Sequence, residues 1–253
     1  MEERCDRINE NLTIIQKSGG LTYGTDAFLL YAYIPSEKKY KKAADLGAGT
    51  GVISFLALKK DKVGFCYDIE IQEDYCDLIN RNAVENRLEG RLLVINKDVR
   101  DVSASDTSGV CDCVFSNPPY MRSGSGFHNA SGEKNIARRE IHGDITDFCR
   151  AAAKLLKFGG SFFVVYRPDR LSELFFAMTS NGIEPKRLTL VYPDKFSPPS
   201  LALCEGISGG SRGLFVSRGL FIYDDKKSPD KTETDDIKNV YSRGAFDDSF
   251  RKA

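Results

Sequence analysis

The sequence is poor in several residue types that build catalytic, metal and membrane sites. Its 253 residues include no tryptophan, three methionines and two histidines. No apolar run approaches the length of a membrane span, and the first residues lack the pattern of a signal peptide, so we expect a cytoplasmic protein. The seven cysteines include no Cys-x-x-Cys pair, which disfavours a zinc site. We therefore expect reduced thiols and no metal.

The charges of the chain balance. Thirty-six Lys and Arg residues stand against 36 Asp and Glu residues, so the formal net charge is zero. A nucleic-acid partner would have to be bound by local basic patches, because the chain as a whole sets up no attractive field. The length fits one large α/β domain or two small ones, and no linker separates a second domain.

Apolar runs and periodic segments alternate along the chain. The runs predict strands at 42–46, 63–69, 92–95, 110–116, 161–166 and 184–191, with closing strands at 201–207 and 214–223. The periodic segments predict helices at 26–34, 51–60, 72–86, 144–157 and 170–180. Strands that alternate with helices in this way indicate an α/β fold with a parallel, doubly wound sheet.

The ends of the chain and two boundaries carry further expectations. We interpret residues 6–16 as an N-terminal hairpin or arm, Thr25 as a helix N-cap and Gly159-Gly160 as a C-cap turn. One domain is expected over 1–223, with an N-terminal arm and helix in 1–41 and a Rossmann-like core in 42–223. The polar tail, 224–253, is expected to be largely disordered.

A glycine-rich turn follows the first core strand. It reads Asp45-Leu-Gly47-Ala-Gly49-Thr-Gly51 and leads directly into a predicted helix. The glycines permit a tight turn and close approach of a ligand, and the helix N-terminus faces that ligand. The dinucleotide fingerprint Gly-x-Gly-x-x-Gly is not matched, which disfavours NAD. A flexible turn without a ligand is the alternative.

Carboxylates follow the next two strands. Asp68 and Glu70 share one face of a straight strand, and either could accept hydrogen bonds from the two hydroxyls of a ribose, so periodicity does not choose between them. Asp98 ends the third strand and could accept the adenine amino proton, while the N–H of Val99 could reach a ring nitrogen. A surface turn is the alternative. All these strand ends meet at the carboxyl edge of the sheet, where open α/β sheets bind ligands.

Asn117-Pro118-Pro119-Tyr120 ends the fourth strand. The Asn117 side-chain oxygen and the Pro118 carbonyl can accept the two N–H bonds of a planar amine, which draws its nitrogen towards sp3 and aims the lone pair at a methyl donor. The prolines stiffen the backbone, and Tyr120 can stack on the planar group. Such a reaction requires alignment more than acid–base chemistry, so no histidine is demanded. The alternative is a structural proline turn.

A basic segment follows this motif directly. Arg122, Arg138 and Arg139 leave it locally positive, so it could contact phosphates, and a solvated face is the alternative. We interpret His142 as an exposed or capping side chain.

Several segments together resemble one family, the bacterial tRNA(Val) adenine-N6-methyltransferases, over about residues 5–224. The segments that carry the resemblance are Ser18–Leu30, the glycine turn, Ile69–Gln72, Asn117–Tyr120, Ile136–His142, Glu184–Leu188 and Glu205–Gly210. Asn-Pro-Pro-Tyr occurs in many amino-methyltransferases, whereas Thr-Asp-Ala-Phe-Leu-Leu and Arg-Glu-Ile-His are more specific. The chain departs from the family at Lys195–Ser200, where the family is more basic.

The resemblance implies a Rossmann-like class I methyltransferase fold: a seven-stranded, mostly parallel sheet with an antiparallel last strand. It implies S-adenosylmethionine as cofactor, tRNA as substrate and Glu70 rather than Asp68 as the ribose ligand, and we expect a monomer. The catalytic residues are expected to be Asn117, Pro118 and Tyr120. The expected cofactor residues are Thr25, Asp26, Asp45, Gly47, Gly49, Gly51, Glu70, Asp98, Val99 and Asn117. The expected substrate residues are Tyr120, Arg122, Arg138 and Arg139.

Rival functions share the Asn-Pro-Pro-Tyr motif. Release-factor glutamine methyltransferases carry a helical domain ahead of the glycine turn, and only a short segment precedes Asp45 here. Ribosomal guanine-N2 enzymes often need a duplicated N-terminal half, and DNA adenine methyltransferases need a target-recognition domain. An inactive protein that binds S-adenosylmethionine and RNA is the non-enzymatic alternative, against which intact Asn117 and Glu70 argue.

Overall fold

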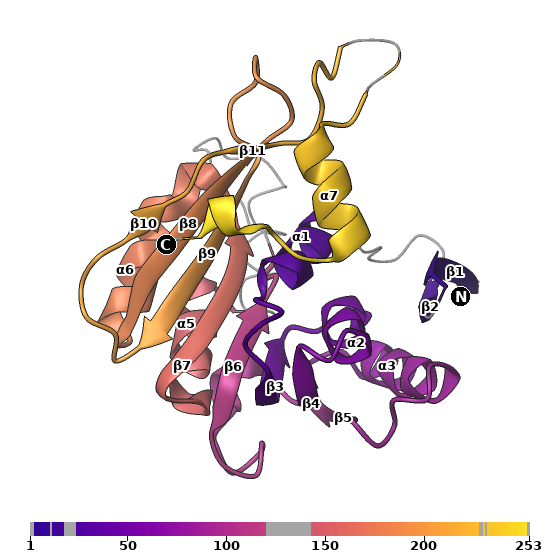
Figure 1. The fold of residues 1–253 in the computed structure, drawn as a ribbon. Coiled ribbons are helices and arrows are strands. Elements are labelled where there is room, and N and C mark those ends of the chain that lie inside the picture. The colour runs from indigo at the N-terminus through magenta and orange to yellow at the C-terminus, as the bar shows by residue number, and fades with distance from the viewer. Residues whose placement is uncertain are drawn as a thin grey trace, which may run out of the picture.

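The centre of the molecule is a mixed sheet with helices on both faces (Figure 1). The structure is a computed structural model that describes residues 3–10, 12–17, 24–119, 143–227, 230 and 232–251. The strands of this sheet are β3 (Tyr40–Leu46), β4 (Val63–Glu70), β5 (Leu92–Asn96), β6 (Cys111–Ser116), β7 (Leu156–Tyr166), β8 (Ile183–Tyr192), β9 (Leu201–Ser208), β10 (Phe215–Val216) and β11 (Leu220–Phe221).

The seven long strands lie in the order β8-β9-β7-β6-β3-β4-β5. β9 is antiparallel to both of its neighbours, whereas the pairs among β7, β6, β3, β4 and β5 are parallel. This arrangement confirms the expected sheet with an antiparallel last strand. The two-residue strands β10 and β11 pair in parallel with β8, so the strand predicted at 214–223 is two short pieces.

Helices cover the two faces of the sheet and separate two apolar clusters. One face carries α1 (Thr25–Tyr33), α2 (Val52–Lys59), α3 (Glu73–Glu85) and α7 (Asp235–Arg243), and the other carries α5 (Ile145–Leu155) and α6 (Leu171–Ser180). Short 3-10 helices lie at η1 (Val99–Asp101), η2 (Pro168–Arg170) and η3 (Asp248–Phe250). Central strands are apolar on both sides because both faces are covered. Within the described part of the chain, every helix is too short or too polar to cross a membrane.

The N-terminal hairpin that the sequence predicted is present. Strands β1 (Glu3–Asn9) and β2 (Leu12–Lys17) pair antiparallel, and α3 holds the hairpin through two asparagines one turn apart. Asn82 exchanges two hydrogen bonds with the backbone of Ile15, at 2.7 and 3.1 Å. Asn86 does the same with Thr13, at 3.0 and 2.6 Å. The two side chains thus satisfy the open edge of β2 as a neighbouring strand would.

The expectation that residues 224–253 are largely disordered is wrong for the described part of the tail. Thr234 caps α7 by accepting from the N–H of Ile237, and Gly244 ends it in the left-handed conformation, with φ 64°. Ile237, Val240, Phe246 and Phe250 are buried in the same apolar cluster as α1. The tail has few apolar residues, but their spacing puts them on one side, and that side covers the core.

Two local predictions also differ from the structure. Gly24, not Thr25, is the N-cap of α1, and Thr25 is its first helical residue. Gly159-Gly160 does not cap α5, because that helix ends at Leu155 and β7 begins at the next residue. The glycines instead lie in a bulge of β7, where Leu156 and Ser161 face Cys111 and Cys113 across the ladder.

Candidate active site

The glycine turn continues β3, which lies between β4 and β6. The N–H groups of Gly47 and Ala48 both donate to the carbonyl of Ile69, at 2.9 and 3.1 Å, so the turn is tied to the end of β4. Gly47, Gly49 and Gly51 have φ values of 71°, 56° and 76°, a region that favours glycine. A Cβ on Gly51 would come within 2.8 Å of Phe55, whereas a Cβ on Gly49 would meet nothing within 4 Å. The turn is therefore packed on its α2 side and open at Gly49.

Glu70 links the turn to the next strand. One carboxylate oxygen accepts from the N–H of Gly49 at 2.9 Å, and the other accepts from the N–H of Gln72 at 2.9 Å. Only 4% of the residue is exposed, at the last position of β4. The oxygen bonded to the Gln72 backbone also accepts from Gln72 Nε2 at 3.3 Å. This carboxylate is therefore fixed at the carboxyl edge of the sheet, and the oxygen that faces Gly49 keeps a lone pair for a further donor.

Asp68, the rival for the ribose role, lies deeper. Its carboxylate accepts from Ser54 Oγ at 2.7 Å, beneath the first turn of α2, and the residue is fully buried. Burial raises its pKa to about 7. The structure therefore distinguishes the two carboxylates, which the sequence pattern could not do. Glu70 lies at the edge of the sheet, whereas Asp68 is buried and accepts a hydrogen bond from α2.

Asp45 has no hydrogen-bond partner for either carboxylate oxygen among the described residues, although it is buried. It lies beside Asp68 in the register of β3 and β4. Burial, followed by the negative charges of Asp68 and Glu70, raises the pKa of Asp45 well above its ordinary value. A buried carboxyl group without a partner is costly, and a cationic ligand group would offset that cost.

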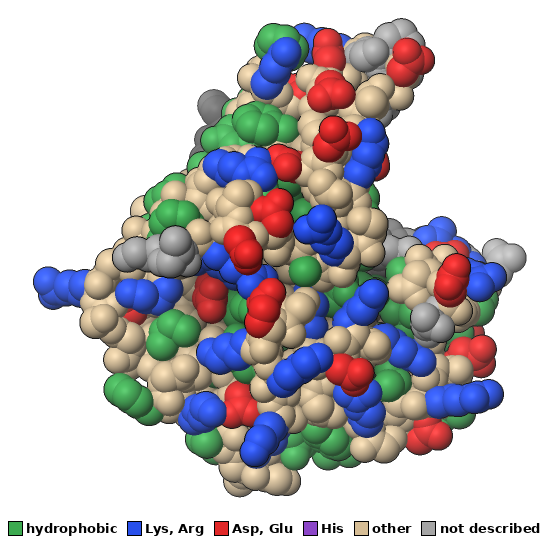
Figure 2. All heavy atoms as spheres, in the orientation of Figure 1, with side chains coloured by type: hydrophobic (Ala, Val, Ile, Leu, Met, Phe, Trp, Pro, Cys, Tyr) green, Lys and Arg blue, Asp and Glu red, His purple; other side chains and the backbone are tan. Residues whose placement is uncertain are grey.

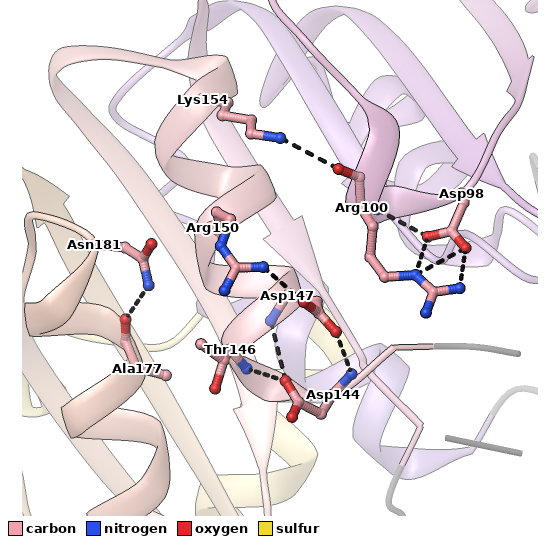
Figure 3. Close-up of polar contacts among 9 residues, drawn as sticks. All are labelled: Asp98, Arg100, Asp144, Thr146, Asp147, Arg150, Lys154, Ala177 and Asn181. Carbon is pink, nitrogen blue, oxygen red and sulfur yellow. Dashed lines mark hydrogen bonds and ion pairs between the residues drawn. The ribbon is translucent and has the colours of Figure 1, made fainter. Parts of the chain in front are cut away.

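Asp98 comes just after β5 and is paired within the chain. Its carboxylate accepts from the backbone N–H of Arg100 at 2.8 Å and from the guanidinium of the same residue, at 3.0 Å from Nε. Figure 3 shows this pair close to the N-terminus of α5, where Asp144 and Asp147 form a capping box. Val99 is buried. An adenine amino group that donates to the Asp98 carboxylate would therefore do so beside Arg100, which already donates to it.

Asn117 follows the last residue of β6 and is joined to α1. Its Nδ2 donates to Asp26 Oδ2 at 2.9 Å, and Asp26 Oδ1 accepts from the N–H of Ala27 at 2.9 Å. A carboxylate only accepts, so the amino side of the Asn117 amide must face Asp26 and its Oδ1 must face the opposite way. Pro118, the next residue, is buried.

Ser116 joins the Asn117 loop to the glycine turn. Its Oγ donates to the carbonyl of Leu46 at 2.7 Å, and the two residues face each other in the ladder of β6 and β3. Leu46 also faces Ile69 of β4, so Asn117, Gly47 and Glu70 each lie one residue beyond the same level of the sheet.

Most of the predicted site residues meet at this edge, and the rest divide into two groups. Asp26 reaches the edge from α1, whereas the side chain of Thr25 is hydrogen-bonded to Tyr241 of α7. Asp98 and Val99 lie beyond β5, one strand further out. Tyr120, Arg122, Arg138 and Arg139 lie outside the described residues.

The sequence interpretation missed four residues that shape the site: Ser54, Gln72, Arg100 and Ser116. Ser116 carried a signal, because it directly precedes the Asn-Pro-Pro-Tyr motif. The others act through contacts that no spacing encodes.

Comparisons with known proteins agree with this arrangement. The family model for the methyltransferase small domain matches residues 18–176. A tRNA1(Val) (adenine(37)-N6)-methyltransferase of Porphyromonas gingivalis is 25% identical over 197 residues, which cover 76% of each chain. A predicted O-methyltransferase of Agrobacterium tumefaciens aligns with a TM-score of 0.67 at 21% identity, over 88% of this chain and 98% of that one. TYW2 of M. jannaschii, crystallised in complex with AdoMet, aligns with a TM-score of 0.55 at 16% identity, over 81% and 84%.

The structural matches show the fold, which is that of the class I methyltransferases, and the family match covers more than half of the chain and includes the glycine turn and Asn117. The chain therefore belongs to the methyltransferase small domain family.

Proposed function

We propose that this protein transfers a methyl group from S-adenosylmethionine to the exocyclic N6 of an adenine in tRNA. The observation that carries the proposal is the hydrogen bond between Asn117 and Asp26, which turns the Asn117 carbonyl oxygen outward at the same sheet edge as the glycine turn. The relatives named tRNA1(Val) (adenine(37)-N6)-methyltransferase support the choice of acceptor. By that likeness, the adenine is the one beside the anticodon of valine tRNA.

The residues of the turn fit the cofactor. Asp45 offers a buried carboxyl group that has no partner among the described residues, which suits a cationic amino group. Glu70 offers a fixed carboxylate at the strand end, which suits a ribose diol. The open side of Gly49 permits a ligand to approach the backbone, and Asp98 with Val99 would hold the adenine. When bound, S-adenosylmethionine supplies an activated methyl group on a sulfonium.

Asn117 and Pro118 supply the alignment that the acceptor needs. The Oδ1 of Asn117 and the backbone carbonyl of Pro118 would accept the two N–H bonds of the amine, which frees its lone pair from the ring system. Asp26 keeps the amide of Asn117 in the orientation that this requires, and the proline backbone holds both acceptors in place before substrate binds. No side chain of the site has to act as a strong base, and the absence of a metal stays a prediction.

The substrate contacts rest on residues outside the described part of the chain. We propose that Tyr120 stacks on the target base, which is turned out of its own stack, and that Arg122, Arg138 and Arg139 contact tRNA phosphates. A monomeric state and a cytoplasmic location also stay predictions. The alternative is another planar amine, such as a guanine N2 of ribosomal RNA or a protein glutamine.

The test is methyl transfer from labelled S-adenosylmethionine by the purified protein. Bulk tRNA should acquire N6-methyladenosine, identified by mass spectrometry of its nucleosides, and the Asn117→Ala variant should acquire almost none. Ribosomal RNA and a release factor serve as competing acceptors. If the protein methylates a glutamine and leaves tRNA unmodified, the proposed acceptor is wrong even though the fold stands.

A further inference from the structure

A cavity of about 510 Å³ lies beside β8, β9 and β10, on the α1 face of the sheet. None of the residues that line it belongs to the candidate active site. Four of its lining side chains are cationic and one is acidic, and the rest of the wall includes apolar side chains. The charged lining residues are Lys186, Arg187, Arg212, Arg251 and Glu205.

Two of the sequence segments singled out above supply this lining, and methyl transfer does not use them. Lys186 and Arg187 come from the segment Glu184–Leu188, and Glu205 comes from Glu205–Gly210. Arg187 faces Glu205 in the antiparallel ladder of β8 and β9, and the strands β7 and β6 lie between this pair and β3, which carries the glycine turn. The pairing therefore brings both segments together at a place distinct from the glycine turn.

Arg187 forms the floor of the cavity and is held on three sides. Its Nε donates to Glu205 at 3.0 Å, one Nη donates to the carbonyl of Tyr33 at 2.9 Å, and its guanidinium lies 3.8 Å from the centre of the Tyr33 ring. The residue is only 5% exposed, and its Nη1 has no hydrogen-bond partner among the described residues. A buried guanidinium nitrogen without an acceptor is an expensive arrangement unless a ligand or water completes it.

The C-terminal segment brings a second guanidinium to the cavity. Arg251, the last described residue, directly follows η3, which lies over β8 and β9 in Figure 1. Arg251 Nη1 is paired with Glu37, but its Nε and Nη2 are buried and have no partner among the described residues. These two nitrogens form one edge of the guanidinium, and such an edge offers two parallel N–H donors.

The upper wall adds two cations and an apolar surface. Lys186 Nζ donates to the carbonyl of Ser211 at 3.0 Å, next to Arg212, which is exposed. In Figure 2, Lys and Arg side chains are spread over this side of the molecule, with Asp and Glu side chains among them. Leu214 and Phe215 line the same cavity. The donors suit a compact anion, and the apolar wall suits the organic part that carries it.

We propose that this cavity binds a phosphate group. A phosphate presents several acceptor oxygens, enough to pair with Nε and Nη2 of Arg251 and with Lys186 and Arg212 together. A carboxylate presents only two. Glu205 is neutralised by Arg187 and does not oppose the anion. The phosphate belongs either to a free phosphate monoester or to the backbone of a bound RNA. The cavity shares no residue with the proposed methyl-transfer site, and its test with inorganic phosphate does not involve S-adenosylmethionine; the RNA alternative alone rests on the proposed function.

The test is calorimetry on the full chain, first with inorganic phosphate and then with AMP. The double variant Lys186→Gln/Arg212→Gln removes two cations of the rim, one half-buried and one exposed, and should weaken phosphate binding by about tenfold or more. The control Lys60→Gln/Arg87→Gln removes the same charge from exposed positions outside the cavity and should leave binding unchanged. Arg251→Ala should weaken binding as well, and its melting temperature without phosphate checks that the tail still folds.

A second measurement separates the two sources of phosphate. If the rim variant loses affinity for AMP but keeps full affinity for tRNA, the ligand is a free monoester. If inorganic phosphate competes with tRNA and the rim variant loses tRNA affinity, the phosphate belongs to RNA. The proposal is overturned if phosphate does not bind, or if the rim and control variants bind it alike. Either result leaves the methyl-transfer assay unaffected, so failure here is distinguishable from failure of the proposed function.

Discussion

Asp45 of β3 lies directly opposite Asp68 of β4 in the parallel register, and both carboxyl groups are buried. Ser54 donates to Asp68, while both oxygens of Asp45 lack a partner among the described residues. Two like charges this close in a dry interior repel each other, so the pair favours protonation. The structure therefore keeps a destabilising feature at the place where the proposed ligand would bring a positive charge.

Asp45→Asn should stabilise the folded protein, and more so at high pH. The pKa values of Asp45 and Asp68 are raised by burial, to about 7 for Asp68, so the folded state holds protons that the unfolded state has already released. Stability should therefore fall as the pH rises above about 4, through the pKa of about 7 for Asp68 and on through the raised pKa of Asp45. The gain should be larger at pH 8 than at pH 5, measured by urea unfolding at both pH values.

The control for this experiment is Asp77→Asn, which removes an exposed carboxylate from α3. It should show no such dependence on pH. An Asp45→Asn gain that is the same at pH 5 and pH 8 would contradict the assignment, because a packing effect does not follow the titration of a carboxyl group.

Glu70→Gln should weaken the binding of S-adenosylmethionine. The carboxylate at the end of β4 already accepts from Gly49 and from the backbone and side chain of Gln72, and the proposed diol contact needs its negative charge. Loss of a charge-assisted contact costs about 1.5–3 kcal/mol, which calorimetry would detect as a Kd roughly ten- to a hundredfold higher. Asp68→Asn is the matched comparison and should have the smaller effect on Kd. The reverse order would assign the ribose to Asp68.

The sheet could be predicted from the sequence because its signals are local. Each core strand is an apolar run that ends in a charged or glycine-rich segment, and the glycine turn requires the backbone conformation that only glycine adopts easily. Residues at the ends of neighbouring parallel strands then meet at one edge without further information. That is why Asp45, Glu70 and Asn117 could be placed together before any contact was known.

The contacts that refine the site could not be predicted in this way. The bond between Asp26 and Asn117 joins residues 91 positions apart, and the pairing of Arg100 with Asp98 depends on side-chain rotamers in η1. The two-residue period of a strand places Asp68 and Glu70 on the same face. The structure distinguishes them because Glu70 is the last residue of β4, whereas Asp68 lies deeper in the sheet. The polar average composition of residues 224–253 predicted disorder. In the structure, single apolar residues of this tail, among them Phe246 and Phe250, are buried in the core.

Asn117→Ala should abolish most of the turnover and leave cofactor binding nearly intact. Asn117 contributes an acceptor that matters chiefly when the amine nitrogen becomes tetrahedral, so its loss raises the barrier more than it weakens ground-state binding. Removal of one preorganised group of this kind lowers kcat by about 10²–10³-fold. Single-turnover kinetics with tRNA and calorimetry with S-adenosylmethionine separate the two effects. Near-normal turnover would exclude Asn117 as the orienting residue.

Asp26→Asn and Asp26→Ala test whether Asp26 orients Asn117 or contacts the cofactor. In the native protein, the two oxygens of Asp26 accept from Ala27 and from Asn117. An asparagine at this position has one oxygen and one amino group, so it must lose one bond, or Asn117 must turn over and present its own amino group to the substrate. Both variants should lower kcat at saturating S-adenosylmethionine by about tenfold or more, because a misoriented acceptor is misplaced for the transition state.

The Kd for S-adenosylmethionine distinguishes the two roles. If Asp26 acts through Asn117, the Kd should change by less than about threefold in both variants, and adding Asp26→Ala to Asn117→Ala should lower kcat little further, since the two residues act as a unit. If Asp26 contacts the cofactor instead, the Kd should rise while kcat at saturation recovers. The melting temperature of each variant checks that α1 still packs, because Asp26 lies in its first turn. A raised Kd with unchanged kcat would falsify the orienting role and return Asp26 to the cofactor site.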